Sequence, residues 1–311
     1  KLGSAVISKA IEKSNLKPAD INEVIMGQVL TGGAGQNPAR QASIESGIPK
    51  EVPSYVVNQV CGSGLRSIAS GFHSILSNNS NVVVAGGQES MSQAPHVIHI
   101  RNGKKLGDTE LIDSMIRDGL WDAFNGYHMG ITAENVAQQF QVTRKDQDKF
   151  AYDSQSKALK AQKENKFNDE IIPFDIKSKK GSITFKKDEH PREGISMEAL
   201  ERLKTAFQKD GTVTAGNASG INDGAAAIVM MSKAEAEKRG LKPLAEIKSW
   251  ASCGVDPSIM GTGPIPSSKK ALEIAGWKSK DLDLIEANEA FAAQSCAVIK
   301  ELSLPMEKVN V

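Results

Sequence analysis

The residue best suited to covalent chemistry is Cys61, which lies in the stretch Asn-Gln-Val-Cys-Gly-Ser-Gly at 58–64. Apolar residues lead into this stretch, and a helical pattern of apolar residues follows it, so Cys61 is expected at the start of a helix. Backbone N–H groups and the helix dipole stabilise a thiolate there and lower the pKa of the thiol. A lone cysteine more often packs as a small hydrophobic group, and that alternative stays open.

Two further polar residues lie near predicted helix starts. Asn288 follows a strand-like run at 282–285. Its amide could hold a water or an oxyanion, and the alternative is a helix N-cap, a role that asparagine favours. His128 lies within the glycine-flanked stretch 126–130, ahead of a helix expected from Thr132, which makes it a candidate for contact with a ligand.

Other kinds of site lack their signatures. His96 and His99 have no accompanying cluster of carboxylates or cysteines, and neither HExxH nor CxxC occurs, so no metal site is expected. The glycine-rich residues 32–38 resemble a dinucleotide loop only superficially, because no glycine stands at the required position and Pro38 ends the pattern.

Composition narrows the class of protein. The 311 residues contain 38 Lys and Arg against 37 Asp and Glu, which argues against a nucleic-acid partner. The three widely spaced cysteines, Cys61, Cys253 and Cys296, suit a reducing compartment. Apolar runs are too short to cross a bilayer, and no signal-peptide pattern opens the chain. We therefore expect a cytoplasmic α/β protein with no membrane partner.

The elements that must position these residues follow from periodicity and composition. Residues 91–221 are richer in charge, Gly, Ser and His, and we expect them to form an inserted loop domain. It would interrupt an N-terminal core half formed by 1–90 and 222–243, and 244–311 would form a C-terminal half. Helices are expected at 1–16, 39–47, 65–76 and 143–163, with a short one through 200–207, and strands at 20–27, 82–87, 183–185, 225–231, 244–251 and 282–285.

An internal repeat supports two related halves. At an offset of 261, Lys9–Glu12 matches Lys270–Glu273, and Lys17–Ile21 matches Lys278–Leu282. This predicts a duplicated α/β unit. The counterpart of Cys61 would fall beyond the last residue, so the second half is expected to be incomplete and the chain truncated at both ends.

Five ordered motifs resemble those of the thiolases, and most closely those of the biosynthetic members. They are Val60-Cys61-Gly62-Ser63-Gly64, Gly86-Gly87-Gln88-Glu89-Ser90-Met91-Ser92, Gly126-Tyr127-His128-Met129-Gly130, Asn217-Ala218-Ser219-Gly220-Ile221-Asn222-Asp223-Gly224-Ala225 and Asn288-Glu289-Ala290-Phe291-Ala292. The resemblance covers the chain nearly end to end. It implies a duplicated α-β-α-β-α layered core with an inserted loop domain.

The resemblance also implies an activity: acetyl-CoA C-acetyl transfer, in which two acetyl-CoA molecules condense to acetoacetyl-CoA and CoA, or the reverse thiolysis. Cys61 matches the nucleophile that carries the acetyl group, and Asn288 matches the residue that positions a water in an oxyanion site. Coenzyme A thioesters are substrates, so no cofactor is implied. A homotetramer with a role in lipid metabolism is expected.

Further positions match the family's contacts with substrate and CoA. They are Leu120, His128, Met129, Arg192, Phe207, Ala215, Gly216, Ser219, Met260, Ala290 and Phe291. Arg192 is expected to meet the anionic nucleotide end of CoA.

Two motifs of the family do not occur in this sequence: Gly-His-Pro with the catalytic histidine, and Cys-Gly-Gly-Gly with a second cysteine. We therefore expect a polypeptide of these residues alone to be inactive. The alternatives are a degradative 3-ketoacyl-CoA thiolase and a non-catalytic CoA-binding fragment.

Overall fold

The computed structural model describes residues 1–179 and 181–311, so Lys180, within the predicted loop domain, lies outside the described residues. The chain forms two compact units. The first comprises Lys1–Leu120, Ile172–Lys186 and Ile221–Glu246, and the second comprises Trp121–Ile171, Lys187–Gly220 and Ile247–Val311. The domain boundaries expected from composition stay a prediction.

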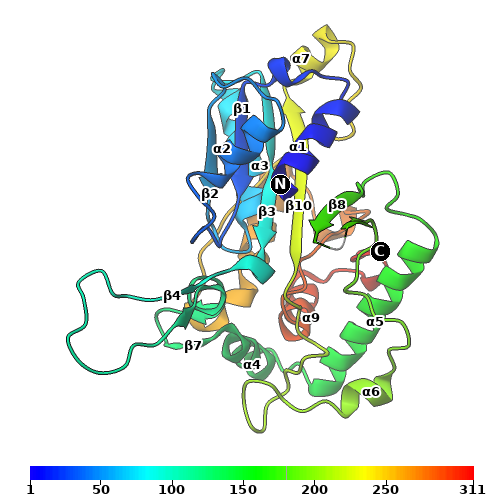
Figure 1. The fold of residues 1–311 in the computed structure, drawn as a ribbon. Coiled ribbons are helices and arrows are strands. Elements are labelled where there is room, and N and C mark those ends of the chain that lie inside the picture. The colour runs from blue at the N-terminus through cyan, green and yellow to red at the C-terminus, as the bar shows by residue number, and fades with distance from the viewer. Residues whose placement is uncertain (180) are drawn as a thin grey trace. The chain divides into compact units, whose positions relative to one another are not determined.

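A four-stranded sheet in the order β10-β3-β1-β2 forms the centre of the first unit (Figure 1). The pairs β1–β2 and β1–β3 are parallel, whereas β10 runs antiparallel to β3. Strands β1 and β3 begin as continuous buried runs, as expected where both faces of a sheet are covered. The strands are β1 (Glu23–Gly27), β2 (Ser54–Val57), β3 (Val82–Ser90) and β10 (Asp223–Met231). The predicted strands at 82–87 and 225–231 are confirmed, and the strand-like run expected at the end of 20–27 is confirmed as β1.

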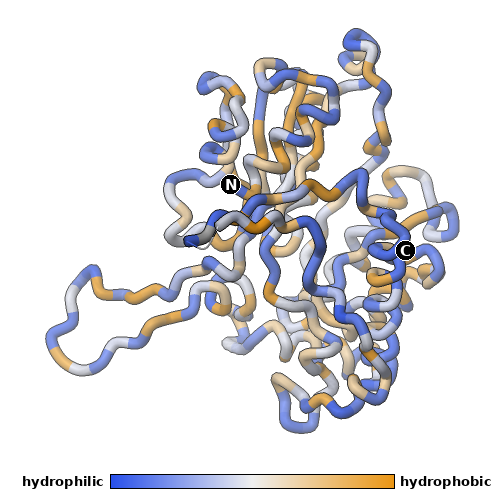
Figure 2. Tube along the Cα trace, turned by 45° about the vertical axis from the view of Figure 1, so that its right-hand side comes forward, coloured by the Kyte–Doolittle hydropathy of each residue, from blue (hydrophilic) through white to orange (hydrophobic). Residues whose placement is uncertain are grey.

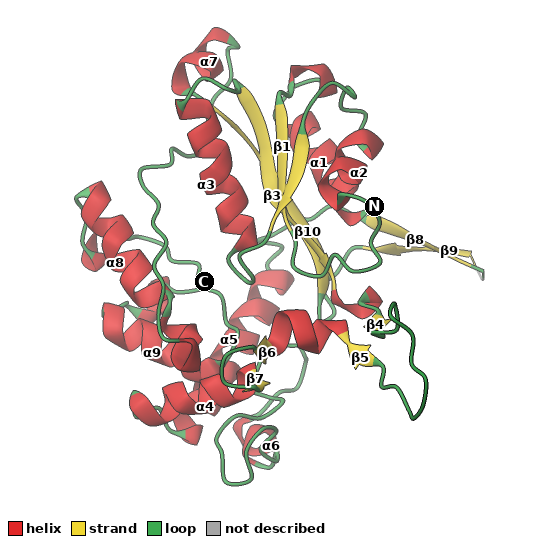
Figure 3. Ribbon diagram, turned by 90° about the vertical axis from the view of Figure 1, so that its left-hand side faces the viewer, coloured by secondary structure: helices red, strands yellow, loops and turns green. Residues whose placement is uncertain are grey.

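Helices cover both faces of this sheet. Helices α1 (Leu2–Lys13) and α2 (Pro38–Glu45) lie on one face, and α3 (Ser63–Leu76) lies on the other (Figure 3). The core between the sheet and the first two helices is aliphatic. It contains Ile7, Ile11, Ile21, Val24, Met26, Ala39, Ala42, Ile48, Val52, Val82 and Val84.

The first turn of α3 rests directly on β1 at Gly27. A Cβ atom at Gly27 would lie 2.4 Å from the carbonyl carbon of Ser63 and 2.6 Å from the nitrogen of Gly64, which is closer than real Cβ contacts. One turn further on, the buried Ser67 hydroxyl donates to the carbonyl of Gly86 in β3 at 2.7 Å. The missing side chain of Gly27 therefore allows the strand-to-helix turn to sit on the sheet.

Two hairpins belong to the first unit. β4 (His96–Val97) pairs with β5 (Ile112–Asp113), and β8 (Phe174–Ser178) pairs with β9 (Gly181–Phe185), which confirms the strand expected at 183–185. The long loop 98–111 between β4 and β5 mixes hydrophobic and hydrophilic positions (Figures 1 and 2). The other elements of this unit are η1 (Pro18–Asp20), η2 (Met91–Gln93), η3 (Met115–Leu120) and α7 (Lys233–Lys238).

The second unit is mainly helical. Helix α9 packs against α4, α5 and α8, and the short η4 packs against α4 and α9. The predicted capping box at 143–146 is confirmed, because the Thr143 hydroxyl accepts from the backbone of Asp146, whose carboxylate accepts from the Thr143 N–H. The elements are β6 (Trp121–Asp122), β7 (Tyr127–His128), α4 (Met129–Gln139), α5 (Arg144–Lys163), α6 (Met197–Glu201), η4 (Pro257–Thr262), α8 (Pro264–Ala275), η5 (Ser279–Asp281), α9 (Ala292–Leu302) and η6 (Met306–Lys308).

The predicted duplication is confirmed in local structure. To within one residue, α8 and η5 lie where the sequence offset places the counterparts of α1 and η1. The backbone N–H of Lys17 donates to Asp20 at 2.7 Å, and that of Lys278 donates to Asp281 at 2.9 Å. The second half also repeats a parallel pairing, because Ile285 forms a parallel bridge with Val309.

Three predicted elements are wrong. A strand is defined by its ladder with a neighbour, and none of the described ladders includes 244–251. Residues 282–285 contribute only a single bridge at Ile285. The helix expected through 200–207 ends at Glu201, because the backbone at Thr205 pairs with the chain at Thr214 instead.

Substituting Gly27 tests the contact between β1 and α3. Gly27→Ala should lower the free energy of unfolding by about 3 kcal/mol, because the added methyl group meets backbone atoms that cannot move independently. Gly64→Ala is the matched control: its Cβ meets nothing within 4 Å, so its free energy of unfolding should stay within about 1 kcal/mol of wild type. Urea denaturation measures both. Equal stability of the two variants would contradict the contact.

Candidate active site

Cys61 lies in the turn between β2 and α3, which confirms its predicted place at a helix start. The strand ends at Val57, the helix begins at Ser63, and the cysteine is exposed. The exposure excludes the alternative of a packed hydrophobic cysteine. Residues that precede a helix in such a turn face solvent or a ligand, so the thiol is available for reaction.

A buried hydroxyl closes this turn. The Ser63 side chain accepts from the N–H of Gln59 at 2.9 Å and donates to the carbonyl of Val60 at 2.5 Å. The N–H of Gly62 also donates to the carbonyl of Gln59 at 3.0 Å. These bonds cross the turn on both sides of Cys61 and fix its backbone.

Val60, directly before Cys61, has a φ of +48°. This left-handed conformation is unfavourable for a β-branched residue, at a cost of about 1–2 kcal/mol. The bond from its N–H to the Asn58 side chain at 2.9 Å and the two bonds at Ser63 hold it in place. Such strain collects at functional sites. Nothing in the sequence signalled it, because valine is among the residues least suited to this conformation.

The predicted lowering of the Cys61 pKa is wrong. Although the residue is exposed, the protein atoms around the sulfur desolvate the thiolate and raise the pKa of the thiol above its ordinary value. The backbone N–H of Cys61 opposes this effect but is the smaller influence. The resting thiol is therefore protonated near neutral pH, and attack on a substrate requires a base to remove the proton.

An open cavity of about 400 Å³ lies in the same unit, beside the carboxyl ends of β1 and β2. Ligands of open α/β sheets commonly bind at this edge. Its lining is mixed and includes the polar side chains of Gln28, Thr31, Asn37 and Asn58. Asn58 links this cavity to the Cys61 turn, because its side chain accepts from Val60.

In the second unit, Asn288 is exposed and lies four residues before α9, between half-buried neighbours. The helix begins at Ala292 with Phe291 as its N-cap, so the capping role considered for Asn288 is wrong. The Asn288 side chain has no hydrogen-bond partner among residues 1–179 and 181–311. An exposed amide without a partner is free to bind a ligand or a water.

His128 forms the N-cap of α4, which begins at Met129 and not at the predicted Thr132. Its Nδ1 accepts from the N–H of Gly130 at 3.0 Å, so the neutral ring carries its proton on Nε2. Burial lowers the pKa of His128 and favours this neutral form. The ring stacks on Phe207 with 4.6 Å between centroids.

Several predicted CoA contacts share this region. Phe207 meets Phe291 edge to face, with 6.3 Å between ring centroids. Met129, Phe207 and Ala290 pack against a buried apolar cluster that contains Phe291. The N–H of Ser219 donates to the carbonyl of Ala290 at 3.0 Å. The structure thus brings together residues far apart in sequence that the resemblance assigned to contacts with substrate and CoA.

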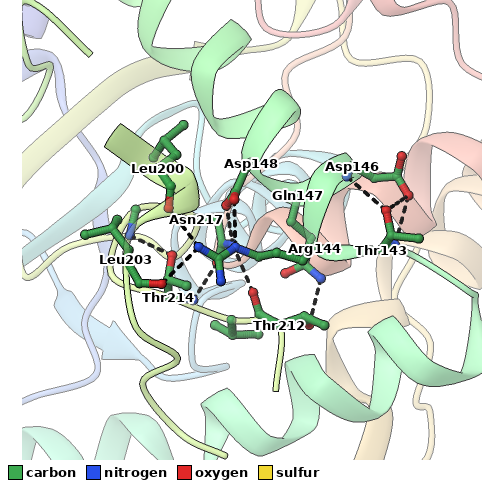
Figure 4. A network of polar contacts seen from close by, with 12 residues as sticks. Thr143, Arg144, Asp146, Gln147, Asp148, Leu200, Leu203, Thr212, Thr214 and Asn217 are labelled. Atoms are coloured by element: carbon green, nitrogen blue, oxygen red, sulfur yellow. Dashed lines mark hydrogen bonds and ion pairs between the residues drawn. The ribbon is translucent and has the colours of Figure 1, made fainter. Parts of the chain in front are cut away.

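A buried polar network supports the loop that presents Ala215 and Ser219, which are both exposed (Figure 4). The fully buried Asp148 accepts from Arg144 at 2.7 Å and from the side chain of Asn217 at 2.9 Å. The Asn217 oxygen in turn accepts from the N–H of Thr214 at 2.8 Å.

Glu134 of α4 anchors the start of the same loop. Its carboxylate accepts from the N–H groups of Thr212 and Val213 at 2.8 Å each. Close packing completes the loop, because a Cβ at Gly216 would lie 2.5 Å from Leu203. Sequence reasoning missed Glu134 and Asp148. The sequence shows each of them only as a carboxylate within an expected helix, and their burial is known only from the structure.

Three other predicted contacts with substrate and CoA lie outside the cluster around Phe207 and Phe291. Arg192 is exposed, and its N–H donates to Gln155 of α5 at 2.8 Å. Met260 lies half-buried in η4. Leu120 ends the first segment of the first unit, to which Cys61 also belongs.

Neither a cluster of metal ligands nor a membrane-spanning helix occurs among the described residues. Within residues 1–179 and 181–311, no group of three or more His, Cys, Asp and Glu side chains could hold a metal ion. In the same part of the chain, no helix is both long enough and apolar enough to cross a membrane.

The sequence matches the model of the thiolase N-terminal domain over residues 1–234 and that of the thiolase C-terminal domain over 241–311. The chain belongs to the thiolase family.

Relatives agree with this assignment. The chain is 57% identical over 310 residues to an acetyl-CoA acetyltransferase of Shinella zoogloeoides, and 53% identical over 312 residues to a cytosolic acetyl-CoA acetyltransferase of Rattus norvegicus. In both cases 100% of this chain and 79% of the relative are covered.

Solved structures share the fold. The crystal structure of the Bacillus anthracis acetyl-CoA acetyltransferase matches with a TM-score of 0.97 at 44% identity, over 99% of this chain and 78% of that one. Human mitochondrial 3-ketoacyl-CoA thiolase matches with a TM-score of 0.96 at 42% identity, over 99% of this chain and 79% of that one.

The raised pKa predicts how Cys61 reacts with iodoacetamide. Since alkylation follows the thiolate fraction, its rate should continue to rise above about pH 9, where a free cysteine is already largely ionised. Peptide mapping by mass spectrometry measures the rate at each cysteine. Cys296, whose pKa burial raises to about 12, should react later and serves as an internal control. A rate at Cys61 that is constant between about pH 7 and 9 would show a lowered pKa instead.

Proposed function

We propose that this protein is an acetyl-CoA C-acetyltransferase that condenses two acetyl-CoA molecules to acetoacetyl-CoA and CoA, and that catalyses the reverse thiolysis. The observation that carries the proposal is the 53–57% identity to proteins named acetyl-CoA acetyltransferase over the whole chain. The exposed Cys61 in its constrained turn supplies the nucleophile that this chemistry needs.

The first half of the reaction forms a thioester on Cys61. As the thiol proton is removed, Sγ attacks the carbonyl carbon of acetyl-CoA. The tetrahedral intermediate collapses with loss of the CoA thiolate, which takes up a proton and leaves as CoA. The acetyl group remains on Cys61. The strained turn exposes Sγ to the thioester and leaves its backbone already ordered, so little reorganisation is required.

The second half forms the carbon–carbon bond. Removal of a proton from the methyl group of a second acetyl-CoA gives an enolate, which attacks the carbonyl of acetyl-Cys61. The bond to Sγ then breaks, and acetoacetyl-CoA and the free thiol result. In this proposal the Asn288 amide positions a water at the enolate oxygen, where negative charge develops. The thioesters themselves provide the activation, so the reaction as proposed requires no metal or organic cofactor.

The residues around His128 are proposed to bind the pantetheine arm of CoA. The stacked rings of His128, Phe207 and Phe291 give an apolar wall, and the neutral His128 keeps one N–H donor on Nε2. Ala215, Gly216 and Ser219 are proposed to contact the arm along the loop that the Asp148 network supports. Exposed Arg192 is proposed to meet the anionic nucleotide end, and Leu120, Met129, Met260 and Ala290 complete the proposed set.

The degradative alternative has less support. Human mitochondrial 3-ketoacyl-CoA thiolase shares the fold almost equally well, so the fold does not discriminate between the two activities. The curated relatives at 53–57% identity are named acetyl-CoA acetyltransferase, which favours that activity, whereas among the solved structures the acetyltransferase and the 3-ketoacyl-CoA thiolase are 44% and 42% identical to this chain. A non-catalytic CoA-binding role has no feature of its own in its favour, because the nucleophile is exposed in a strained turn.

A homotetramer in the cytoplasm, with a role in lipid metabolism, completes the proposal. The loop 98–111 presents apolar side chains to solvent, and Leu106 is 91% exposed. An exposed apolar segment of this kind favours contact with another chain. The relative from Rattus norvegicus is named as a cytosolic enzyme, which supports the proposed compartment. No nucleic-acid or membrane partner is proposed.

Replacing the nucleophile tests the proposed covalent intermediate. In the full-length protein, Cys61→Ser should remove acetyl labelling from radiolabelled acetyl-CoA and lower turnover by about a thousandfold or more, because a neutral hydroxyl is a far weaker nucleophile. Cys253→Ser is the matched control and should be labelled like wild type. Retained labelling of Cys61→Ser would contradict the assignment.

Replacing His128 separates its two structural roles. Asparagine is a good N-cap, so His128→Asn should leave the free energy of unfolding within about 0.5 kcal/mol of wild type while it removes the ring that stacks on Phe207. The KM for CoA in thiolysis should then rise several-fold with little change in kcat. His128→Ala should lose the cap as well, at about 1 kcal/mol. An unchanged KM in both variants would exclude a contact with CoA.

A further inference from the structure

Asn310 makes a two-point contact with the segment that carries Asn288. Its Oδ1 accepts from the N–H of Ala287 at 2.8 Å, and its Nδ2 donates to the carbonyl of the same residue at 2.9 Å. The same Nδ2 also donates to Oε1 of Glu289 at 2.6 Å. One side chain therefore holds the residue before Asn288 and the residue after it.

Both oxygens of the Glu289 carboxylate accept a hydrogen bond in this arrangement. Its second oxygen, Oε2, accepts from the Ser154 hydroxyl of α5 at 2.6 Å. One turn along the same helix, Lys157 donates to the carbonyls of Met306 and Val309 at 3.0 and 2.7 Å. Helix α5 thus anchors both chain segments that meet around Asn288. Because both carboxylate oxygens of Glu289 are bound, it serves as an anchor and not as an acid or base.

Asn288 itself is left out of this network. Its neighbours on both sides are fixed, while its own side chain is exposed and has no partner among residues 1–179 and 181–311. A polar side chain on a rigid backbone, with its hydrogen-bonding groups unused, is preorganised to bind a reacting group or a water.

We infer that Asn310 is a positioning residue, which fixes Asn288 for enolate stabilisation through its contacts with Ala287 and Glu289. The inference rests on the proposed function and deepens it. Only a carboxamide satisfies the whole arrangement, because it accepts from one peptide N–H and donates to a peptide carbonyl and a carboxylate. Asparagine also tolerates the left-handed φ of +48° at position 310.

The variant Asn310→Asp isolates this role. Aspartate has the same shape and also tolerates a positive φ, but its carboxylate cannot donate to Ala287 and it repels Glu289. In the full-length protein, rapid-quench measurements should show acetylation of Cys61 within about twofold of wild type. Condensation of the acetylated enzyme with a second acetyl-CoA should be slowed about tenfold or more, with little change in KM, because misplacement of a catalytic group by a fraction of an ångström is costly.

A rescue separates positioning from general damage. In the double variant Asn310→Asp/Glu289→Gln, the new amide can donate to the new carboxylate and the repulsion disappears, so condensation should recover about threefold or more relative to Asn310→Asp. Asn165→Asp is the matched control. It makes the same substitution at another asparagine with positive φ, one that is exposed, and both half-reactions should proceed as in wild type.

The possible outcomes are distinguishable. Condensation at the wild-type rate in Asn310→Asp overturns the inference, as does an equal loss in both half-reactions or a double variant that does not recover. Asn288→Ala should slow condensation while Cys61 is still acetylated, and unchanged condensation in that variant would refute the role of Asn288. A wild-type protein that neither acetylates Cys61 nor forms acetoacetyl-CoA would refute the proposed function itself.

Discussion

Backbone contact between Gly27 in β1 and the first turn of α3 is the constraint on which the position of Cys61, the proposed nucleophile, depends. Any side chain at position 27 would displace the helix start, and Ser63 would move with it. Ser63 supplies the bonds that hold Val60 in its left-handed conformation. The exposure of Cys61 therefore results from a chain of contacts that begins with a missing side chain in a buried strand.

The second unit must position segments that have little regular structure and that carry the residues proposed to bind CoA. Carboxylates perform this task by accepting hydrogen bonds from backbone and side-chain donors. The buried Asp148 and Glu134 hold the loop at 212–219, and the half-buried Glu289 ties the Asn288 segment to α5. A buried charge is tolerated when it is hydrogen-bonded, and Asp148 and Glu134 both meet that condition.

The raised pKa of Cys61 also shows that the thiol depends on a separate base for its reaction. Desolvation outweighs the favourable N–H groups, so the thiol is held neutral until a base acts on it. A neutral resting thiol resists unwanted alkylation and oxidation, since the thiolate is the reactive species. Helix-start position and thiol acidity are thus separate properties, and the first does not ensure the second.

Local patterns in the sequence were sufficient for most of the first unit. The strands around Val24, Val83 and Val229, the flanking helices and the duplication were all predictable, because they depend on apolar periodicity and on residues near one another in the chain. The position of Cys61 between a strand and a helix was equally predictable. So was the family, because its motifs are contiguous stretches of sequence.

Tertiary structure alone decided the pKa of Cys61, the strain at Val60 and the partners of Asp148, Glu289 and Asn310. Each depends on atoms contributed by distant parts of the chain, and no local pattern encodes desolvation or a long-range hydrogen bond. The expected strands at 244–251 and 282–285 were wrong for the same reason, since a strand requires a neighbour and apolar character alone does not specify one. The sequence determined which residues could react and where the elements around them begin. Long-range packing determined their protonation, their conformation and the side chains that hold them in place.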